Sequence, residues 1–197
     1  MTRVLQIAFL GVAALLAATL GLFYIAGGRE GLIPLIQIGS DFRLASSNGG
    51  AVDAKDLKGK PYAVFFGFTH CPEVCPTTLY EMSNTLAKLG DAAKDFRVFF
   101  ITVDPERDTA AMLKDYLANF DPRIEALVPN MEQLPKVAAD FHVYYAKSPT
   151  SDGSYTMDHT ATLFLLDENG LLASTISFGE APDVREAKIR KLLGRGR

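Results

Sequence analysis

The sequence predicts an α/β domain built on a mixed β-sheet flanked by helices, with an N-terminal transmembrane helix ahead of it. Three observations carry this prediction. Twenty residues without a charge, Ile7–Ala26, lie near the start of the 197-residue chain. Two largely apolar runs, YAVFFGF at 62–68 and FRVFFITV at 96–103, are typical of strands covered on both faces. Segments with helical spacing of apolar residues alternate with these runs, as in sheets that contain parallel strands.

The N-terminal run is long enough to span a bilayer. A transmembrane helix needs about 20 apolar residues at ~1.5 Å rise each. The alternative is a signal peptide cleaved after the small residues near Ala17–Ala18. The apolar region of a signal peptide usually runs ~7–15 residues, which is shorter than this one. We therefore expect an uncleaved anchor at residues 1–27, a linker at 28–39 and a folded domain at 40–197.

The charge distribution indicates the side of the membrane and the class of partner. Arg3 is the only charged residue before residue 29, and positive flanks tend to stay in the cytoplasm, so the domain is expected outside. Residues 28–197 carry 19 Lys+Arg (20 less Arg3) against 23 Asp+Glu, a formal charge of −4. The sequence has no basic stripe with interleaved aromatics, so no nucleic-acid partner is expected. Outside the cytoplasm, two cysteines can form a disulfide.

The first half of the domain is expected to form a hairpin followed by two strand–helix units. FRLAS and AVDA flank the turn residues Ser47–Gly50, and KGKP at 58–61 is a turn before the first buried strand. A helix is expected at 77–89, where apolar residues recur at helical spacing and Gly90 ends the pattern. After the second buried strand, the sequence becomes helical from about Asp108.

The second half is expected to hold a short strand, a helix, a polar segment, a pair of antiparallel strands and a final helix. In chain order these are IEALV, the helix 131–143, a loop or hairpin at 144–159, the strands 160–167 and 171–178, and the helix Asp183–Leu193. Glu168–Gly170 joins the paired strands as a tight turn. A hairpin followed by β-α-β-α-β-α-β-β-α is the order of a thioredoxin-like fold.

Both cysteines of the chain, Cys71 and Cys75, lie in the turn between the first buried strand and the following helix. Each precedes a proline, which disfavours the α region for the cysteine. Proline suits the first helical position, so Pro76 is expected there with Cys75 as the capping residue. Unpaired N–H groups and the helix dipole then favour thiolates, which act as nucleophiles and as metal ligands.

Two plainer interpretations of this cysteine pair are weaker. A purely structural disulfide would close a very short loop, where the entropic stabilisation is smallest. Two inert buried thiols fit poorly beside prolines at a strand end. Three intervening residues allow a disulfide and also leave room for a metal ion between the sulfurs.

The donor set points to copper. Structural zinc takes four protein ligands and an iron–sulfur cluster usually takes four cysteines, whereas Cu(I) accepts two thiolates and an imidazole can complete a site for Cu(I) or Cu(II). Of the three histidines, His159 is the favoured third ligand, because its loop would lie beside the cysteine turn. His70 and His142 are weaker candidates. Met157 could be a soft auxiliary ligand, but methionine more often serves packing.

Three motifs together resemble the Sco (SenC) family: GFTHCPEVCP, TVDPERDT and MDHTATLFLLD, in this order behind an N-terminal anchor. The resemblance covers roughly residues 35–193 and implies a membrane-tethered, thioredoxin-like copper protein. It implies that Cys71, Cys75 and His159 are copper ligands, and that the two cysteines are also a redox-active pair with a reversible disulfide. The Asp104–Thr109 motif receives no ligand role, and Asp104–Pro105 is expected to shape the loop above the sheet and start the next helix.

The resemblance also implies a role in assembling the dinuclear copper site of cytochrome c oxidase. The chain would be a metallochaperone that passes copper to the copper-site subunit, or a thiol–disulfide oxidoreductase that reduces that subunit's cysteines; in the second case His159 is dispensable. Other copper chaperones or thiol reductants of the periplasm are further expected partners. The short N-terminal segment suggests a bacterial, single-pass inner-membrane protein that faces the periplasm. A thiol peroxidase ranks lower, because the sequence shows no peroxide-activating motif and no tryptophan.

Overall fold

The structure is a computed structural model, and it describes residues 38–39 and 41–194, together with residues 6, 11, 15–19 and 21. The chain divides into two units, Met1–Ile36 and Gln37–Arg197. The expected anchor at residues 1–27 and the linker at 28–39 lie largely outside the described residues. Within the part of the chain that is described, no helix combines the length and the apolarity that a membrane crossing requires.

The second unit contains a seven-stranded mixed sheet with the order β2-β1-β5-β4-β3-β8-β9. Its strands are β1 (Arg43–Ser46), β2 (Ala51–Asp53), β3 (Tyr62–Gly67), β4 (Arg97–Thr102), β5 (Ile124–Val128), β8 (Thr162–Leu166) and β9 (Leu172–Ser177). The three central strands β3, β4 and β5 run parallel, and the outer strands pair antiparallel. A separate antiparallel hairpin consists of β6 (Tyr145–Pro149) and β7 (Tyr155–His159).

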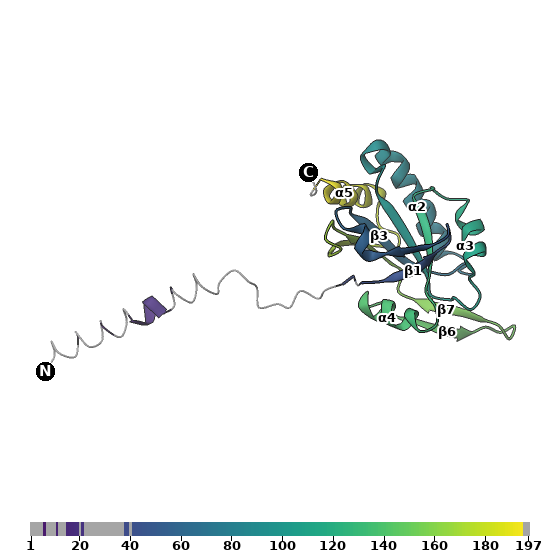
Figure 1. Cartoon of the computed structure of the whole chain (residues 1–197), viewed down its shortest axis with the longest axis horizontal. Coiled ribbons are helices and arrows are strands. Elements are labelled where there is room, and N and C mark those ends of the chain that lie inside the picture. Colours follow the sequence, from purple (N-terminus) through teal and green to yellow (C-terminus); the bar gives the residue numbers. More distant parts are fainter. Residues whose placement is uncertain are drawn as a thin grey trace. The chain divides into compact units, whose positions relative to one another are not determined.

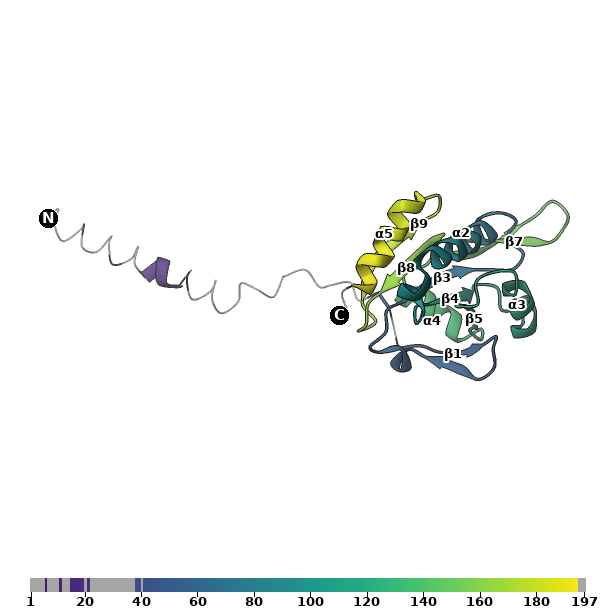
Figure 2. The same cartoon turned by 90° about the horizontal axis from the view of Figure 1, so that it is seen from above.

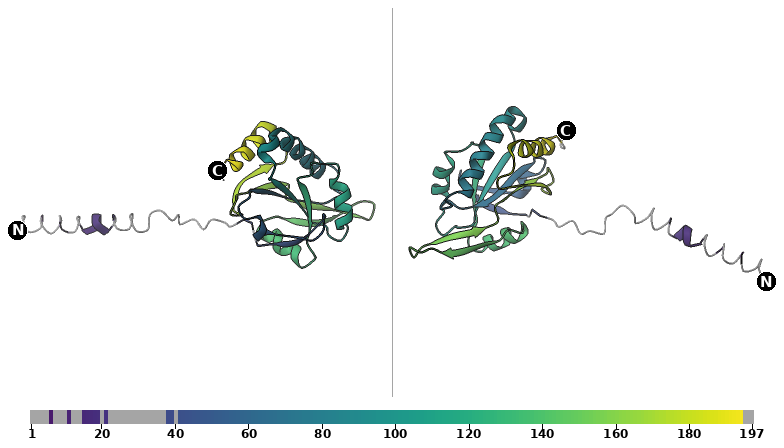
Figure 3. Two further views of the ribbon diagram at one scale, coloured as in Figure 1. Left: turned by 45° about the horizontal axis from the view of Figure 1, so that its top comes forward. Right: turned by 180° about the vertical axis from the view of Figure 1, so that it is seen from behind.

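Helices cover both faces of this sheet. The α-helices of this unit are α2 (Val74–Leu89), α3 (Ala110–Leu117), α4 (Gln133–Asp140) and α5 (Pro182–Leu193), and the short 3-10 helices are η1 (Ala54–Leu57) and η2 (Gly90–Ala93). On one face, α2 and α5 lie side by side (Figures 1 and 2). On the other face lie α4 and the hairpin β6–β7 (Figures 1 and 3).

The core consists mainly of phenylalanines from the central strands. Phe65 and Phe66 of β3 are fully buried and point to opposite faces, as successive residues of a strand must. Phe65 packs against Phe100 of β4 with ring centroids 6.0 Å apart, and Phe66 packs edge-on against Phe141, beyond α4, at 5.4 Å. This packing explains why the continuous apolar runs belong to strands that are covered on both faces.

The mixed thioredoxin-like sheet with flanking helices is confirmed, with two refinements. The polar segment 144–159, expected as a loop or hairpin, is the hairpin β6–β7, in which Tyr145 pairs with His159. His159 therefore ends a strand instead of lying in a loop. The predicted tight turn between β8 and β9 is present, with Gly170 at φ 78°, a left-handed conformation that glycine adopts without strain.

Candidate metal centre

Cys71 and Cys75 lie beyond the carboxyl end of β3, where the chain turns into α2. The backbone N–H of Cys71 donates to the carbonyl of Phe68 at 3.3 Å. The backbone N–H of Cys75 donates to Sγ of Cys71, also at 3.3 Å. The Cys71 sulfur thus lies at the N-terminus of α2, where free N–H groups and the helix dipole stabilise an anion. Both cysteines are free thiols in this structure.

The predicted start of the helix was wrong by two residues. Pro76 was expected at the first helical position with Cys75 as the cap, but α2 begins at Val74 and its N-cap residue is Glu73. Proline is tolerated inside the first turn because the N–H groups there have no intrahelical partner in any case. The Thr77 N–H donates to the Glu73 carbonyl at 3.1 Å and closes that turn. This earlier start places Cys75 on the buried side of the helix.

His159, the last residue of β7, meets the cysteine pair from a different part of the chain. Its Nε2 lies 3.6 Å from Sγ of Cys75, and the ligand atoms of Cys71, Cys75 and His159 all lie within 4.8 Å of one another. The other ring nitrogen, Nδ1, lies 3.1 Å from the carbonyl oxygen of Thr160. A carbonyl can only accept, so Nδ1 donates to it and Nε2 faces the sulfurs.

Close packing fixes the positions of His159 and Cys75. The imidazole of His159 lies at right angles to the ring of Phe68, with centroids 5.8 Å apart. A Cβ placed on Gly67 would lie 2.8 Å from Sγ of Cys75 and 2.5 Å from the ring of Phe100. Glycine at the end of β3 is therefore what allows the Cys75 sulfur to approach the strand backbone.

The two thiols differ in their surroundings and in their acidity. Cys71 is half-buried and Cys75 is fully buried. The hydrogen bond from the Cys75 thiol, followed by the contact with His159 and the backbone N–H groups of Cys75 and Glu73, lowers the pKa of Cys71 to about 4 against the opposing effect of burial. The same Cys71 contact, burial and the Cys71 charge raise the pKa of Cys75. The pair therefore holds one thiolate, on the more exposed sulfur.

The motif TVDPERDT forms the loop between β4 and α3, and it contacts the hairpin that carries His159. The hydroxyl of Tyr155 in β7 donates to Oδ1 of Asp104 at 3.0 Å, and Arg107 donates to the carbonyl of Tyr155 at 2.8 Å. The Arg107 guanidinium also stacks on the Tyr155 ring, 3.7 Å from its centroid, and pairs with Asp104. Asp104 shapes the loop as expected, but α3 begins at Ala110 with Thr109 as its N-cap, so Asp104–Pro105 does not start this helix. The contact with the hairpin was not predicted from the sequence.

The remaining candidate ligands lie outside the group of three. His70 is exposed, and its Nδ1 lies 3.1 Å from the hydroxyl of Thr69. His142 follows α4, is exposed and has a left-handed backbone with φ 53°. Met157 is buried in the hydrophobic core, which favours packing over metal binding.

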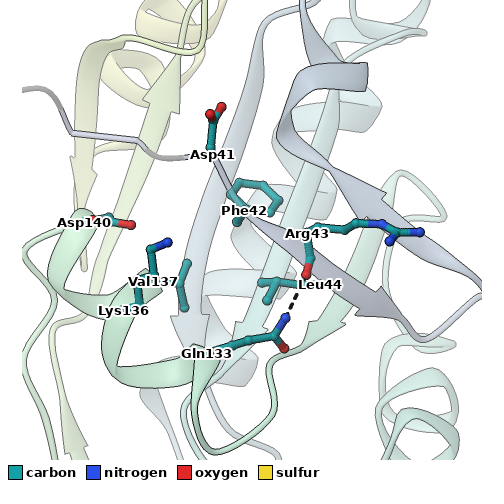
Figure 4. Close-up of a pocket in the computed structure, with 8 residues that line it drawn as sticks. All are labelled: Asp41, Phe42, Arg43, Leu44, Gln133, Lys136, Val137 and Asp140. Atoms are coloured by element: carbon teal, nitrogen blue, oxygen red, sulfur yellow. Dashed lines mark hydrogen bonds between the residues drawn. The ribbon is translucent and has the colours of Figure 1, made fainter.

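A hollow of about 160 Å³ lies between the start of β1 and α4 (Figure 4). Its described lining includes the carboxylates of Asp41 and Asp140 and the cation of Lys136, but neither cysteine nor histidine. Gln133 donates its side-chain N–H to the carbonyl of Arg43 at 3.0 Å and ties α4 to β1 (Figure 4). Among its described residues, this hollow therefore offers no soft donor for copper.

Known proteins resemble this chain in both fold and sequence. The model of the SCO1/SenC family matches residues 33–194. The chain belongs to the SCO1/SenC family. A SCO2-like protein of Rickettsia felis is 39% identical over 137 residues, which are 68% of this chain and 67% of the relative. The structure of Bradyrhizobium japonicum ScoI with copper bound superposes with a TM-score of 0.73 at 46% identity and covers 79% of this chain and 99% of ScoI. Copper-bound ScoI of Arabidopsis thaliana gives a TM-score of 0.75 at 31% identity and covers 80% and 99%.

Proposed function

We propose that this SCO1/SenC protein is a copper-binding metallochaperone that assists assembly of the dinuclear copper site of cytochrome c oxidase. The observation that carries the proposal is the convergence of Cys71, Cys75 and His159, whose ligand atoms lie within 4.8 Å of one another. Two sulfurs suit the soft Cu(I) ion, and the imidazole nitrogen completes a site for Cu(I) or Cu(II). Three protein donors fall one short of a structural zinc site. Copper-bound relatives with the same fold support this choice of metal.

The three ligands contribute differently to copper loading. Cys71 already favours the thiolate, so it is the first sulfur ready to bind. Cys75 keeps its proton until copper binds, so loading releases a proton at this sulfur. His159 faces the sulfurs with Nε2, while its Nδ1 stays hydrogen-bonded to the Thr160 carbonyl. The half-exposed Cys71 is also the sulfur that an incoming ligand of the acceptor site can reach most easily.

The proposal includes a location and a partner. The run Ile7–Ala26 would anchor the chain in the inner membrane, the linker 28–39 would follow, and the domain 40–197 would face the periplasm and the copper-site subunit of the oxidase. Mass spectrometry of the membrane-extracted protein tests the anchor. A mature N-terminus near residue 20 would exclude it.

The asymmetry of the two thiols favours a second candidate function, thiol–disulfide exchange. The Cys71 thiolate would attack a disulfide of the copper-site subunit and form a mixed disulfide, releasing one thiolate of that subunit. Cys75 would then lose its proton, attack Cys71 and release the second thiolate. The subunit gains two electrons, this protein ends with a Cys71–Cys75 disulfide, and a periplasmic thiol reductant restores the dithiol.

One set of variants separates the two functions. The reduced full-length chain, purified in detergent without oxygen, is titrated with Cu(I) and is assayed for reduction of an oxidised copper-site subunit. If the protein is a metallochaperone, the wild type should bind one equivalent of copper, and His159→Ala should impair both copper binding and oxidase assembly. Full oxidase assembly by His159→Ala despite weakened copper binding would favour the oxidoreductase.

A further inference from the structure

Asp108 is a carboxylate with no exposed surface, and it lies behind the cysteine turn. Its Oδ2 accepts from the backbone N–H of Thr69 at 3.1 Å and from the hydroxyl of Thr102 at 2.6 Å. Its Oδ1 accepts from the hydroxyl of Thr69 at 2.5 Å. Among the described residues, its one salt-bridge-range contact is with His70, whose ring Nδ1 lies 4.0 Å from Oδ1.

These bonds join two segments that are far apart in the sequence. Thr69 lies two residues before Cys71, whereas Thr102 is the last residue of the central strand β4. Thr102 is itself fully buried, so it offers a fixed point of attachment. Asp108 therefore ties the start of the cysteine turn to the rigid centre of the sheet.

Three hydrogen bonds offset the cost of burying the Asp108 carboxylate. Burying a carboxylate with few cationic partners is costly unless hydrogen bonds compensate it. Asp108 compensates its charge with three donors, and two of them come from the cysteine turn. A carboxylate accepts all three at once, whereas an amide at the same place would turn its NH₂ group toward at least one donor.

We propose that Asp108 is a positioning residue: its carboxylate holds the turn from Thr69 to Cys71 so that the Cys71 sulfur meets Cys75 and His159. The inference rests on the proposed copper site, and it deepens that proposal by naming what fixes the more exposed of its two sulfurs. Groups that orient ligands without touching the metal typically contribute about 10- to 100-fold to affinity.

The test uses the reduced full-length chain in detergent and substitutions on both sides of this contact. Asp108→Asn keeps the shape and removes the charge, and Thr69→Val removes the hydroxyl that donates to Oδ1. Asp115→Asn changes an exposed carboxylate of α3 as a charge control, and Ile124→Val lowers core stability away from the turn as a stability control. The readouts are the thermal midpoint, the Cu(I) affinity against a chromophoric chelator and the thiolate-to-Cu(II) absorption band.

We expect Asp108→Asn to weaken Cu(I) binding about 10- to 100-fold and to shift the absorption band, with a smaller effect of the same sign in Thr69→Val. Asp115→Asn should match the wild type, and Ile124→Val should lower only the thermal midpoint. A folded Asp108→Asn variant with wild-type affinity and band would overturn the inference. Copper affinity that follows the thermal midpoint across all variants, Ile124→Val included, would also overturn it.

A copper-free readout separates this inference from the proposed function. The thiol–disulfide equilibrium of the Cys71–Cys75 pair with dithiothreitol depends on the geometry of the turn and needs no metal. We expect Asp108→Asn to change that equilibrium constant at least about threefold. If the wild type binds no copper, the metallochaperone proposal fails, and an unchanged constant in Asp108→Asn then refutes the positioning role as well.

Discussion

Replacing Gly67 by alanine tests whether the metal centre needs the Cys75 sulfur to lie close to the backbone of β3. The new Cβ would lie 2.8 Å from Sγ of Cys75 and 2.5 and 2.9 Å from two ring atoms of Phe100. All three distances are shorter than ordinary contacts, and Cys75 and Phe100 are both fully buried, so neither can move freely. Overpacking of this kind costs about 1–3 kcal/mol. For a protein of this size, the thermal midpoint should fall by roughly 2–12 °C.

The same substitution should also disturb copper binding, because the sulfur is one of the atoms that must move. We expect Gly67→Ala to weaken Cu(I) affinity by roughly tenfold or more, in the range seen when a ligand loses its positioning. The control is Gly194→Ala at the end of α5, where the nearest atom to the new Cβ is a carbonyl oxygen 3.4 Å away. That variant should stay within about 0.5 kcal/mol of the wild type. Unchanged stability and copper affinity in Gly67→Ala would refute the packing argument.

Three further predictions concern the thiols. Because the pKa of Cys71 is lowered to about 4, its alkylation rate by iodoacetamide should be nearly constant from pH 6 to pH 8. An ordinary thiol would react roughly 80-fold faster at pH 8 than at pH 6. A rise of that size for Cys71 would contradict the prediction. The reduced protein should gain stability, relative to the Cys71→Ser/Cys75→Ser double variant, as the pH rises from about 4 to about 8.5, because the unfolded state there binds one more proton at Cys71. Above about pH 8.5 this stability difference should decline, since the folded state keeps the Cys75 proton that the unfolded state loses. Urea unfolding from about pH 4 to above about pH 8.5 measures the free energy of unfolding of both proteins. A difference that does not change with pH would contradict the prediction. The oxidised protein should bind no Cu(I), since the sulfurs are joined to each other, and stoichiometric Cu(I) binding without prior reduction would contradict this.

Much of the fold could be predicted from the sequence because its strongest signals are local. The runs at 62–68 and 96–103 lack the alternation of a half-exposed strand, and this alone indicates strands with two covered faces. The start of α2 was missed because the rule that a residue before proline avoids helix was applied to Cys75. In the first turn that preference is weak enough for the surrounding packing to override it.

The sequence predicted the ligands of the candidate site but not the residues that hold those ligands in place. Cys71, Cys75 and His159 have rare chemistry and a recognisable spacing, so they stand out in a sequence. Asp108 lies 39 positions from Thr69, and an aspartate before a helix usually indicates only a helix start. Its contact with the cysteine turn depends on the parallel pairing of β3 and β4, which a single sequence does not specify.

Copper binding by His159→Ala tests the central claim most directly. The reduced full-length chain is titrated with copper without oxygen, and the thiolate-to-Cu(II) absorption band is recorded beside the Cu(I) affinity. His142→Asn is the matched control, because His142 is exposed, lies outside the group of three ligands, and has a backbone conformation that asparagine tolerates. The account predicts that His159→Ala folds, loses or shifts the Cu(II) band, and weakens Cu(II) binding far more than Cu(I) binding, whereas His142→Asn behaves as the wild type. An unchanged band and unchanged affinities in His159→Ala would contradict the three-ligand copper site.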